Sequence, residues 1–326
     1  MCPITRPTVV RSVLLGLLLL LTSPLSQAEP LKWTVWPIPG VVNVADGKPT
    51  DGITMLALRQ LMQRLPELEP DYRLANRLRQ QRDMEYGLQF CSTPLFKRPD
   101  TDRYAYFVPF LVSTPIQAVV RRDQLEHFPL RDNRLVLSDL LETTDSHVAV
   151  SAFRTYPPLI QDWLAVAEPL GRAERISGSL SGSNLLLMVS HGRIDLTFEF
   201  ATITRAVSSQ LQPPEPLLSL PLAEEMELVV SGIYCSGSDW GRAMAEQLDQ
   251  AIRELLQDPQ ALEQLLALYA DYLPAETWAA FDKKIIAYYR ERAEHVTQWP
   301  SPTVADSVPE SPTPAETIPP PPEPDQ

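Results

Sequence analysis

The fold is indicated most clearly by the stretch His147-Val148-Ala149-Val150-Ser151-Ala152-Phe153-Arg154-Thr155-Tyr156. Its first half has the length and apolar composition of a buried strand, and it leads through a short loop into a helical pattern over residues 157–168. A buried strand followed by a helix is the repeating unit of parallel α/β sheets, and ligands bind such sheets at the edge where the strands end. The stretch therefore predicts an α/β protein with a ligand site near Ser151 and Arg154.

The same alternation of strands and helices extends in both directions along the chain. Strand patterns occur at Leu31–Trp36, Leu88–Cys91, Tyr104–Phe107, Ile116–Val120, Arg175–Ile176, Ile194–Phe198 and Glu225–Tyr234. Helical patterns begin at Asp51-Gly52, run from Leu74 to Tyr86 and from Asn184 to Ser190, and continue over 239–256, 259–271 and 275–295. This order favours largely parallel sheets.

Residues 1–28 have the three parts of a cleavable signal peptide. Arg6 and Arg11 give a positive flank, the apolar run 13–21 follows, and Ser26-Gln27-Ala28 ends the segment with small residues. The apolar run is far shorter than the roughly 20 residues that span a bilayer. We therefore expect a cleaved signal and a periplasmic location.

The remaining 298 residues carry 26 basic and 41 acidic residues, a formal net charge of −15. This balance argues against nucleic acid or an anionic membrane surface as a partner. A chain of this length suits two lobes better than one compact core. Residues 299–326, with ten prolines, five acids and no Lys or Arg, are expected to form a disordered, proline-rich acidic tail.

Cys91 and Cys235 are the two cysteines that follow the signal segment. In an oxidising compartment a disulfide between them is expected, and the alternative is two buried thiols. The histidines have no metal-ligand spacing, and the chain has neither a Cys-x-x-Cys motif nor a phosphate-binding glycine loop. No metal, cofactor or catalytic residue is predicted.

Three positions offer ligand chemistry on local sequence alone. Arg154 could bind a carboxylate through two hydrogen bonds or be an ordinary surface arginine. Trp36 could form an aromatic wall for a ligand or belong to the core. Ser179, in the stretch 178–182, precedes a helix whose free N–H groups could hold an anion, or Ser183 could simply cap that helix.

A set of motifs follows in a fixed order along the chain. They are the aromatic-proline end of the first strand, Asp51-Gly52, 102–110, the crossover strand 114–121, 148–156, 188–195, Tyr234-Cys235-Ser236 and Asp239-Trp240-Gly241. In this order the motifs resemble the type II periplasmic solute-binding proteins, the bacterial extracellular solute-binding protein family 3. Within this family the chain is most similar to a poorly characterised branch that carries the two cysteines.

The resemblance implies two α/β lobes joined by two crossover hinge strands. Lobe 1 would consist of residues 29–113 and 230–298, and lobe 2 of residues 114–229. Cys91 and Cys235 would then both lie in lobe 1.

The resemblance also suggests site residues. Arg103 lies near the arginine that binds the ligand carboxylate in amino-acid binders, although it stands four rather than six residues before Phe107. Ser151 corresponds to a lobe 2 hydroxyl. The position of the carboxylate that binds the ligand ammonium is Phe200 here, and Glu199 beside it is a candidate ligand-binding residue.

These observations predict a monomeric binding protein that captures a small polar or anionic ligand for a membrane permease or a sensor. Two alternatives remain open. One is an enzyme of the dehydratase or lytic type, with Glu199 or Asp195 as a general acid or base. The other is an interaction protein whose cleft no longer binds solute and whose proline-rich tail docks a partner.

Overall fold

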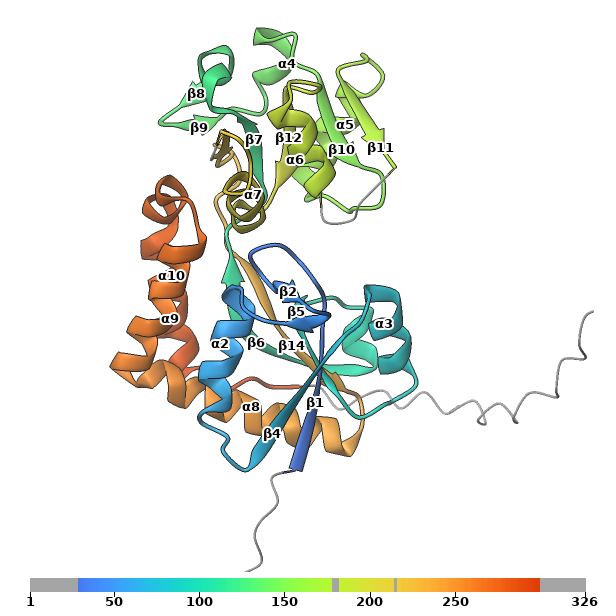
Figure 1. Cartoon of the computed structure of the whole chain (residues 1–326), viewed down its shortest axis with the longest axis vertical. Helices are drawn as coiled ribbons and strands as arrows, with labels where there is room; N and C mark the ends of the chain where they lie inside the picture. The colour runs from blue at the N-terminus through green and yellow to red at the C-terminus, as the bar shows by residue number, and fades with distance from the viewer. Residues whose placement is uncertain (1–28, 178–181, 214–215, 300–326) are drawn as a thin grey trace, which may run out of the picture.

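The computed structural model describes residues 29–299, apart from 178–181 and 214–215. The predicted signal peptide, Ser179 and residues 300–326 therefore lie outside the described residues. The chain forms two α/β lobes, each built on a five-stranded sheet, as predicted (Figure 1). Across the described residues, no helix has the length and apolar character needed to cross a membrane.

Lobe 1 contains a sheet with the strand order β4-β1-β5-β14-β6. β1 pairs in parallel with β4 and β5, whereas β14 runs antiparallel to both β5 and β6. The strands are β1 (Glu29–Val35), β4 (Leu68–Leu74), β5 (Cys91–Phe96), β6 (Ala105–Ser113) and β14 (Val229–Ser236). A small hairpin of β2 (Val44–Ala45) and β3 (Lys48–Pro49) follows β1.

The helices of lobe 1 cover both faces of this sheet. The larger core includes Trp33 of β1 and the apolar faces of α2, α8, α9 and α10, while Met84 of α3 packs in a smaller cluster with Phe107 and Tyr234. The helices are α2 (Ile53–Met62), α3 (Arg77–Glu85), α8 (Asp239–Gln257), α9 (Pro259–Tyr272) and α10 (Ala275–Glu294), with the 3-10 turn η1 (Thr101–Arg103).

Lobe 2 contains a sheet with the strand order β11-β10-β12-β7-β13. β10 pairs in parallel with β11 and β12, and β7 runs antiparallel to β12 and β13. The strands are β7 (Gln117–Arg121), β10 (Val148–Ser151), β11 (Ala173–Ile176), β12 (Leu196–Glu199) and β13 (Leu217–Leu220). The buried strand predicted in the stretch 147–156 is β10, and each of its residues is buried.

One face of the lobe 2 sheet packs on α5, and the other packs on α6 and α7. The remaining elements are η2 (Arg122–His127), a hairpin of β8 (Leu130–Arg131) and β9 (Arg134–Leu135), α4 (Leu140–Thr143), α5 (Pro158–Ala167), α6 (Ser183–Ser190) and α7 (Ala201–Ser208).

Two segments connect the lobes. Residues 114–116 lead from β6 into β7, and residues 221–228 return from β13 to β14. Near these crossovers, Thr277 at the start of α10 donates a hydrogen bond to Gln117 of β7 across 3.2 Å. The predicted boundaries of lobe 2, 114 and 229, are close to these two segments, and they remain a prediction.

Several features of the chain differ from the sequence-based expectations. β4, α7 and β13 have no counterpart among the predicted elements, and Leu74, predicted to begin a helix, ends β4. Trp299, predicted to begin the tail, instead packs on lobe 1. Its indole N–H donates to the carbonyl of Phe107 across 2.7 Å, and its ring lies edge-on to Tyr106.

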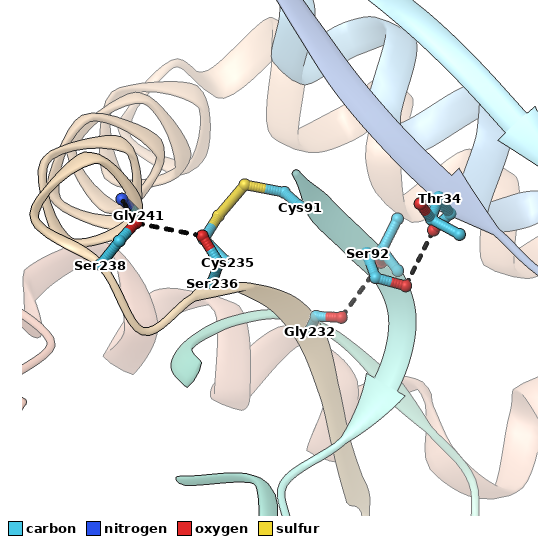
Figure 2. The surroundings of a disulfide bond; sticks show 9 residues. Thr34, Cys91, Ser92, Gly232, Cys235, Ser236, Ser238 and Gly241 are labelled. Atoms are coloured by element: carbon cyan, nitrogen blue, oxygen red, sulfur yellow. Dashed lines mark hydrogen bonds between the residues drawn. A yellow bond between two sulfur atoms is a disulfide. The ribbon is translucent and has the colours of Figure 1, made fainter. Parts of the chain in front are cut away.

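The predicted alternatives for the cysteines resolve to a disulfide between Cys91 and Cys235, which joins β5 to β14 (Figure 2). The two residues face each other in the antiparallel ladder. Directly after this point, α8 begins: Ser238 caps it by accepting a hydrogen bond from the Gly241 amide across 3.1 Å. A Cβ at Gly241 would come within 1.7 Å of the Ser236 carbonyl oxygen, so the close approach of helix and strand requires glycine there.

Reduction of this disulfide is expected to destabilise lobe 1. The bond closes a loop with a sequence separation of 144 residues, and disulfides typically stabilise folded proteins by about 2–4 kcal/mol. Urea unfolding should therefore shift to lower urea when a reducing agent is added. The double variant Cys91→Ala/Cys235→Ala is the control, since its unfolding should not respond to reductant. If the urea midpoint of the natural protein is the same with and without reductant, the expectation is contradicted.

Candidate ligand site between the lobes

A cavity with a volume of about 710 Å³ lies between the two lobes. Its lobe 1 wall includes residues that follow β1 and β5, and its lobe 2 wall includes the loop after β10 and the start of α7. Both crossovers contribute, through 114–116 and Glu225. The cavity therefore lies at the strand ends of both sheets, the edge at which open α/β sheets bind ligands.

Trp36 lines this cavity and is half-buried. It directly follows β1, in which Trp33 is fully buried in the lobe 1 core. Of the two, Trp33 is thus the tryptophan that belongs to the core, and Trp36 lies on the cavity wall. Contact between Trp36 and a ligand remains a prediction.

Arg103 lies outside the cavity lining. Its guanidinium is exposed and pairs with Asp100 across 3.1 Å. Thr101, which stands six residues before Phe107, does line the cavity. Both residues belong to the 3-10 turn η1, where residues two apart point in different directions because each turn takes three residues. The structure thus places Thr101, and not Arg103, where the resemblance expects a carboxylate-binding side chain.

Arg98 is a cavity residue that the sequence analysis missed. Its backbone N–H donates to the Tyr234 hydroxyl across 2.8 Å, and that hydroxyl donates in turn to Asp102 across 2.6 Å. β14 therefore fixes the loop that carries Arg98. The guanidinium itself is exposed and has no ion pair with any residue that the structure describes. Its position just past the end of β5 was the only signal in the sequence.

Ser151 shapes the lobe 2 loop and does not line the cavity. It is 2% exposed; its amide donates to the Tyr156 hydroxyl across 3.0 Å, and its hydroxyl accepts from the Phe153 amide across 3.3 Å. These bonds turn the chain after β10. Phe153, Arg154 and Tyr156 then line the cavity.

Arg154 forms an ion pair with Glu199, the last residue of β12, across 2.7 Å. The Arg154 guanidinium also lies over the rings of Phe200 and Tyr156, at 5.1 and 5.6 Å from their centroids. A Cβ at Gly182, which has a φ of +71°, would meet the second Glu199 carboxylate oxygen at 2.1 Å. Glycine at this position thus allows the carboxylate to be enclosed.

Glu199 is 1% exposed, and its second carboxylate oxygen has no hydrogen-bond partner among the described residues. Burial raises the pKa of this carboxyl above its ordinary value of 4.5, while the charge of Arg154 and the Phe200 amide oppose the rise. Arg154 therefore faces the cavity with its charge compensated from behind. The ligand-binding roles assigned to Arg154 and Glu199 remain predictions.

Aromatic side chains are the second group that the sequence analysis missed. Phe96, Phe153 and Phe200 line the cavity, and Phe96 of lobe 1 contacts Phe200 of lobe 2 with ring centroids 5.6 Å apart. Only Phe200 had been noted, as the residue in place of a carboxylate. Within the described parts of the chain, no cluster of three His, Cys, Asp or Glu residues could hold a metal ion.

Comparison with known proteins identifies the fold. No family model and no curated protein matches the chain. Among solved structures, a probable amino-acid ABC transporter extracellular-binding protein from Bacillus subtilis aligns with a TM-score of 0.57 and 12% identity, over 76% of this chain and 99% of that one. A structure from a study of glutathione import through GshT and the cystine ABC importer of Streptococcus mutans aligns with a TM-score of 0.56 and 13% identity, over 76% and 97%.

A histidine kinase sensor domain that resembles periplasmic binding proteins aligns with a TM-score of 0.53 and 14% identity, over 76% of this chain and 97% of that one. These likenesses show that the chain has the two-lobed fold of type II periplasmic binding proteins, as the resemblance in sequence implied. Two of these neighbours are named as an extracellular-binding protein and a sensor domain, and the third comes from a study of import.

The buried Glu199 carboxyl should make stability depend on pH. Its pKa is raised in the folded state, so its favourable contribution is present below 4.5 and is lost as the pH rises through the folded-state value. From just below 4.5 to neutrality, the natural protein should therefore lose stability relative to Glu199→Gln. Urea unfolding at a series of pH values measures this difference.

Glu69→Gln is the matched control, because Glu69 is exposed on β4. Its stability should follow that of the natural protein across the series. Parallel curves for Glu199→Gln and the natural protein would show that the buried carboxylate is not destabilised by its site.

Proposed function

We propose that this protein is a periplasmic solute-binding protein that captures a small polar or anionic molecule between its lobes. It would deliver this molecule to the permease of an ABC transporter or present it to a membrane sensor. The observation that carries the proposal is the cavity of about 710 Å³ that both lobes and both crossovers enclose. A volume of this size is typical of small-molecule sites. The signal peptide predicted at residues 1–28 supports the periplasmic location.

Both destinations have a counterpart among the structural neighbours. The Bacillus subtilis protein is named as an extracellular-binding protein of an amino-acid ABC transporter, and an ancestral arginine-binding protein of similar fold was solved with arginine bound. The sensor domain of a histidine kinase has the same architecture. These functions belong to the neighbours, and at 12–14% identity they support only the general role of solute capture for this chain.

Arg98 gives the cavity its preference for an anionic group. The positive charge of Arg154 is compensated by Glu199, and Asp100 in the lining is paired with Arg103. The guanidinium of Arg98 is left to bind a carboxylate or a similar group, with Thr101 nearby in the chain as a hydroxyl donor. Closure of the lobes would remove water from this pair and strengthen it.

Ligand binding should be detectable together with a change in shape. Titration calorimetry of the purified mature protein against a panel of small organic solutes is expected to give saturable binding to one chemical class. X-ray scattering should then show a smaller radius of gyration with that ligand than without it, because the crossovers allow the lobes to approach. Absence of both binding and compaction across a broad panel would contradict the proposal.

Replacement of Arg98 should weaken the affinity for an anionic ligand. A hydrogen bond to a charged group contributes about 1.5–3 kcal/mol, so Arg98→Ala should raise the dissociation constant roughly 10- to 100-fold. Arg131→Ala is the matched control, since Arg131 of β8 is also an exposed arginine but lies outside the cavity. Equal losses in the two variants would rule out a specific role for Arg98.

A further inference from the structure

The lining of the inter-lobe cavity is mostly apolar, which bears on the class of ligand. Aromatic rings enter it from both lobes, and proline and aliphatic side chains fill much of the remaining wall. Six of the aromatic residues that line it are Trp36, Phe96, Tyr104, Phe153, Tyr156 and Phe200. A compact hydrophilic solute would bind weakly to such a wall, because polar groups that leave water need hydrogen-bond partners.

Phe153 is the most informative of these residues. It lies in the loop after β10, and 59% of its surface is exposed, which is unusual for a large aromatic side chain. The hydrogen bond from its amide to Ser151 holds this loop in place. An aromatic residue that lines a cavity yet remains exposed is available to cover the apolar part of a ligand.

Phe200 distinguishes this cavity from a site for free amino acids. Its backbone N–H is bound to Glu199 across 2.8 Å, and its ring contacts Phe96 of the opposite lobe. Where the resemblance expects a carboxylate for an ammonium group, the cavity therefore has an aromatic ring. Glu199 itself is buried beneath Arg154 and cannot take that role.

The remaining charges leave one cation and one carboxylate without an ion pair among the described lining residues, Arg98 and Glu225. They belong to different segments of the chain, Arg98 to the loop after β5 and Glu225 to the second crossover. Arg98 is thus the group that would bind an anionic end, and the ring-bearing surfaces would bind the body attached to it.

We propose that the ligand is an organic acid with a bulky apolar or aromatic body, bound without recognition of an ammonium group. This inference rests on the proposed function and narrows its substrate class. The carboxylate of the ligand would pair with Arg98, and the apolar body would lie between the aromatic residues of the two lobes. Glu225 would not contact the ligand as a charge partner.

Three probe molecules test this class by calorimetry: 3-phenylpropionate, its α-amino counterpart L-phenylalanine, and succinate as a small hydrophilic acid. We expect 3-phenylpropionate to bind at least tenfold more tightly than the other two. Phe153→Ala should weaken its binding several-fold, whereas Leu170→Ala, which removes an equally exposed apolar side chain of lobe 2 outside the cavity, should not. Phe153 is exposed, so its replacement should not impair folding.

Two further variants separate the alternatives. Glu225→Gln should leave the affinity for 3-phenylpropionate unchanged or slightly raised, because it removes a negative charge from an anion site. Phe200→Asp should weaken the binding of 3-phenylpropionate and shift the preference of the protein towards L-phenylalanine. A loss of affinity in Glu225→Gln, or tighter binding of L-phenylalanine to the natural protein, would overturn the absence of ammonium recognition.

Failure of this inference differs from failure of the proposed function. Tight binding of succinate or of another hydrophilic solute, with no effect of Phe153→Ala, would overturn the apolar ligand class and leave solute capture intact. Binding of no member of the broad panel by the folded protein would overturn both.

Discussion

β14 returns from lobe 2 and enters the lobe 1 sheet between β5 and β6, antiparallel to both. This placement forces the chain to cross between the lobes twice, once on each side of lobe 2. It also brings Tyr234 beneath the loop that carries Arg98, and Cys235 opposite Cys91. The position of the candidate anion-binding group and the covalent link within lobe 1 are therefore consequences of one strand pairing. Because both cysteines lie in the same sheet, their bond leaves the two crossovers free to bend.

The two lobes present arginines of different character to the cavity. Arg154 in lobe 2 is held by a buried carboxylate and by two aromatic rings, which fixes its position and compensates its charge. Arg98 in lobe 1 is fixed only through its backbone, and its side chain extends from an exposed loop. Lobe 2 thus offers a rigid, nearly neutral and aromatic surface, whereas lobe 1 offers a cation that can adapt to a ligand.

Most of the fold could be predicted because buried strands and long amphipathic helices have clear periodicities. β4 was missed because it is an edge strand that contains Pro70 and alternates with charged residues, and an edge position tolerates both. The location of the site could be predicted from the strand ends. Which arginine faces the cavity could not. A shift of two residues within a 3-10 turn exchanges Thr101 for Arg103, and no sequence pattern fixed that rotation. Arg98 belongs to no motif, so only the backbone could place it.

The two crossovers also impose an order on folding. All five strands of lobe 2 lie within the continuous segment 117–220, so this lobe can complete its sheet from neighbouring chain. Lobe 1 cannot, since its interior strand β14 and the core helices α8, α9 and α10 follow lobe 2 in the sequence. As the chain is synthesised from its N-terminus, Cys91 cannot pair until Cys235 arrives, and the part of the larger core that α8, α9 and α10 form stays incomplete for as long. The lobe that begins first is therefore the one that finishes last, which makes its completion the slow, non-local step of folding.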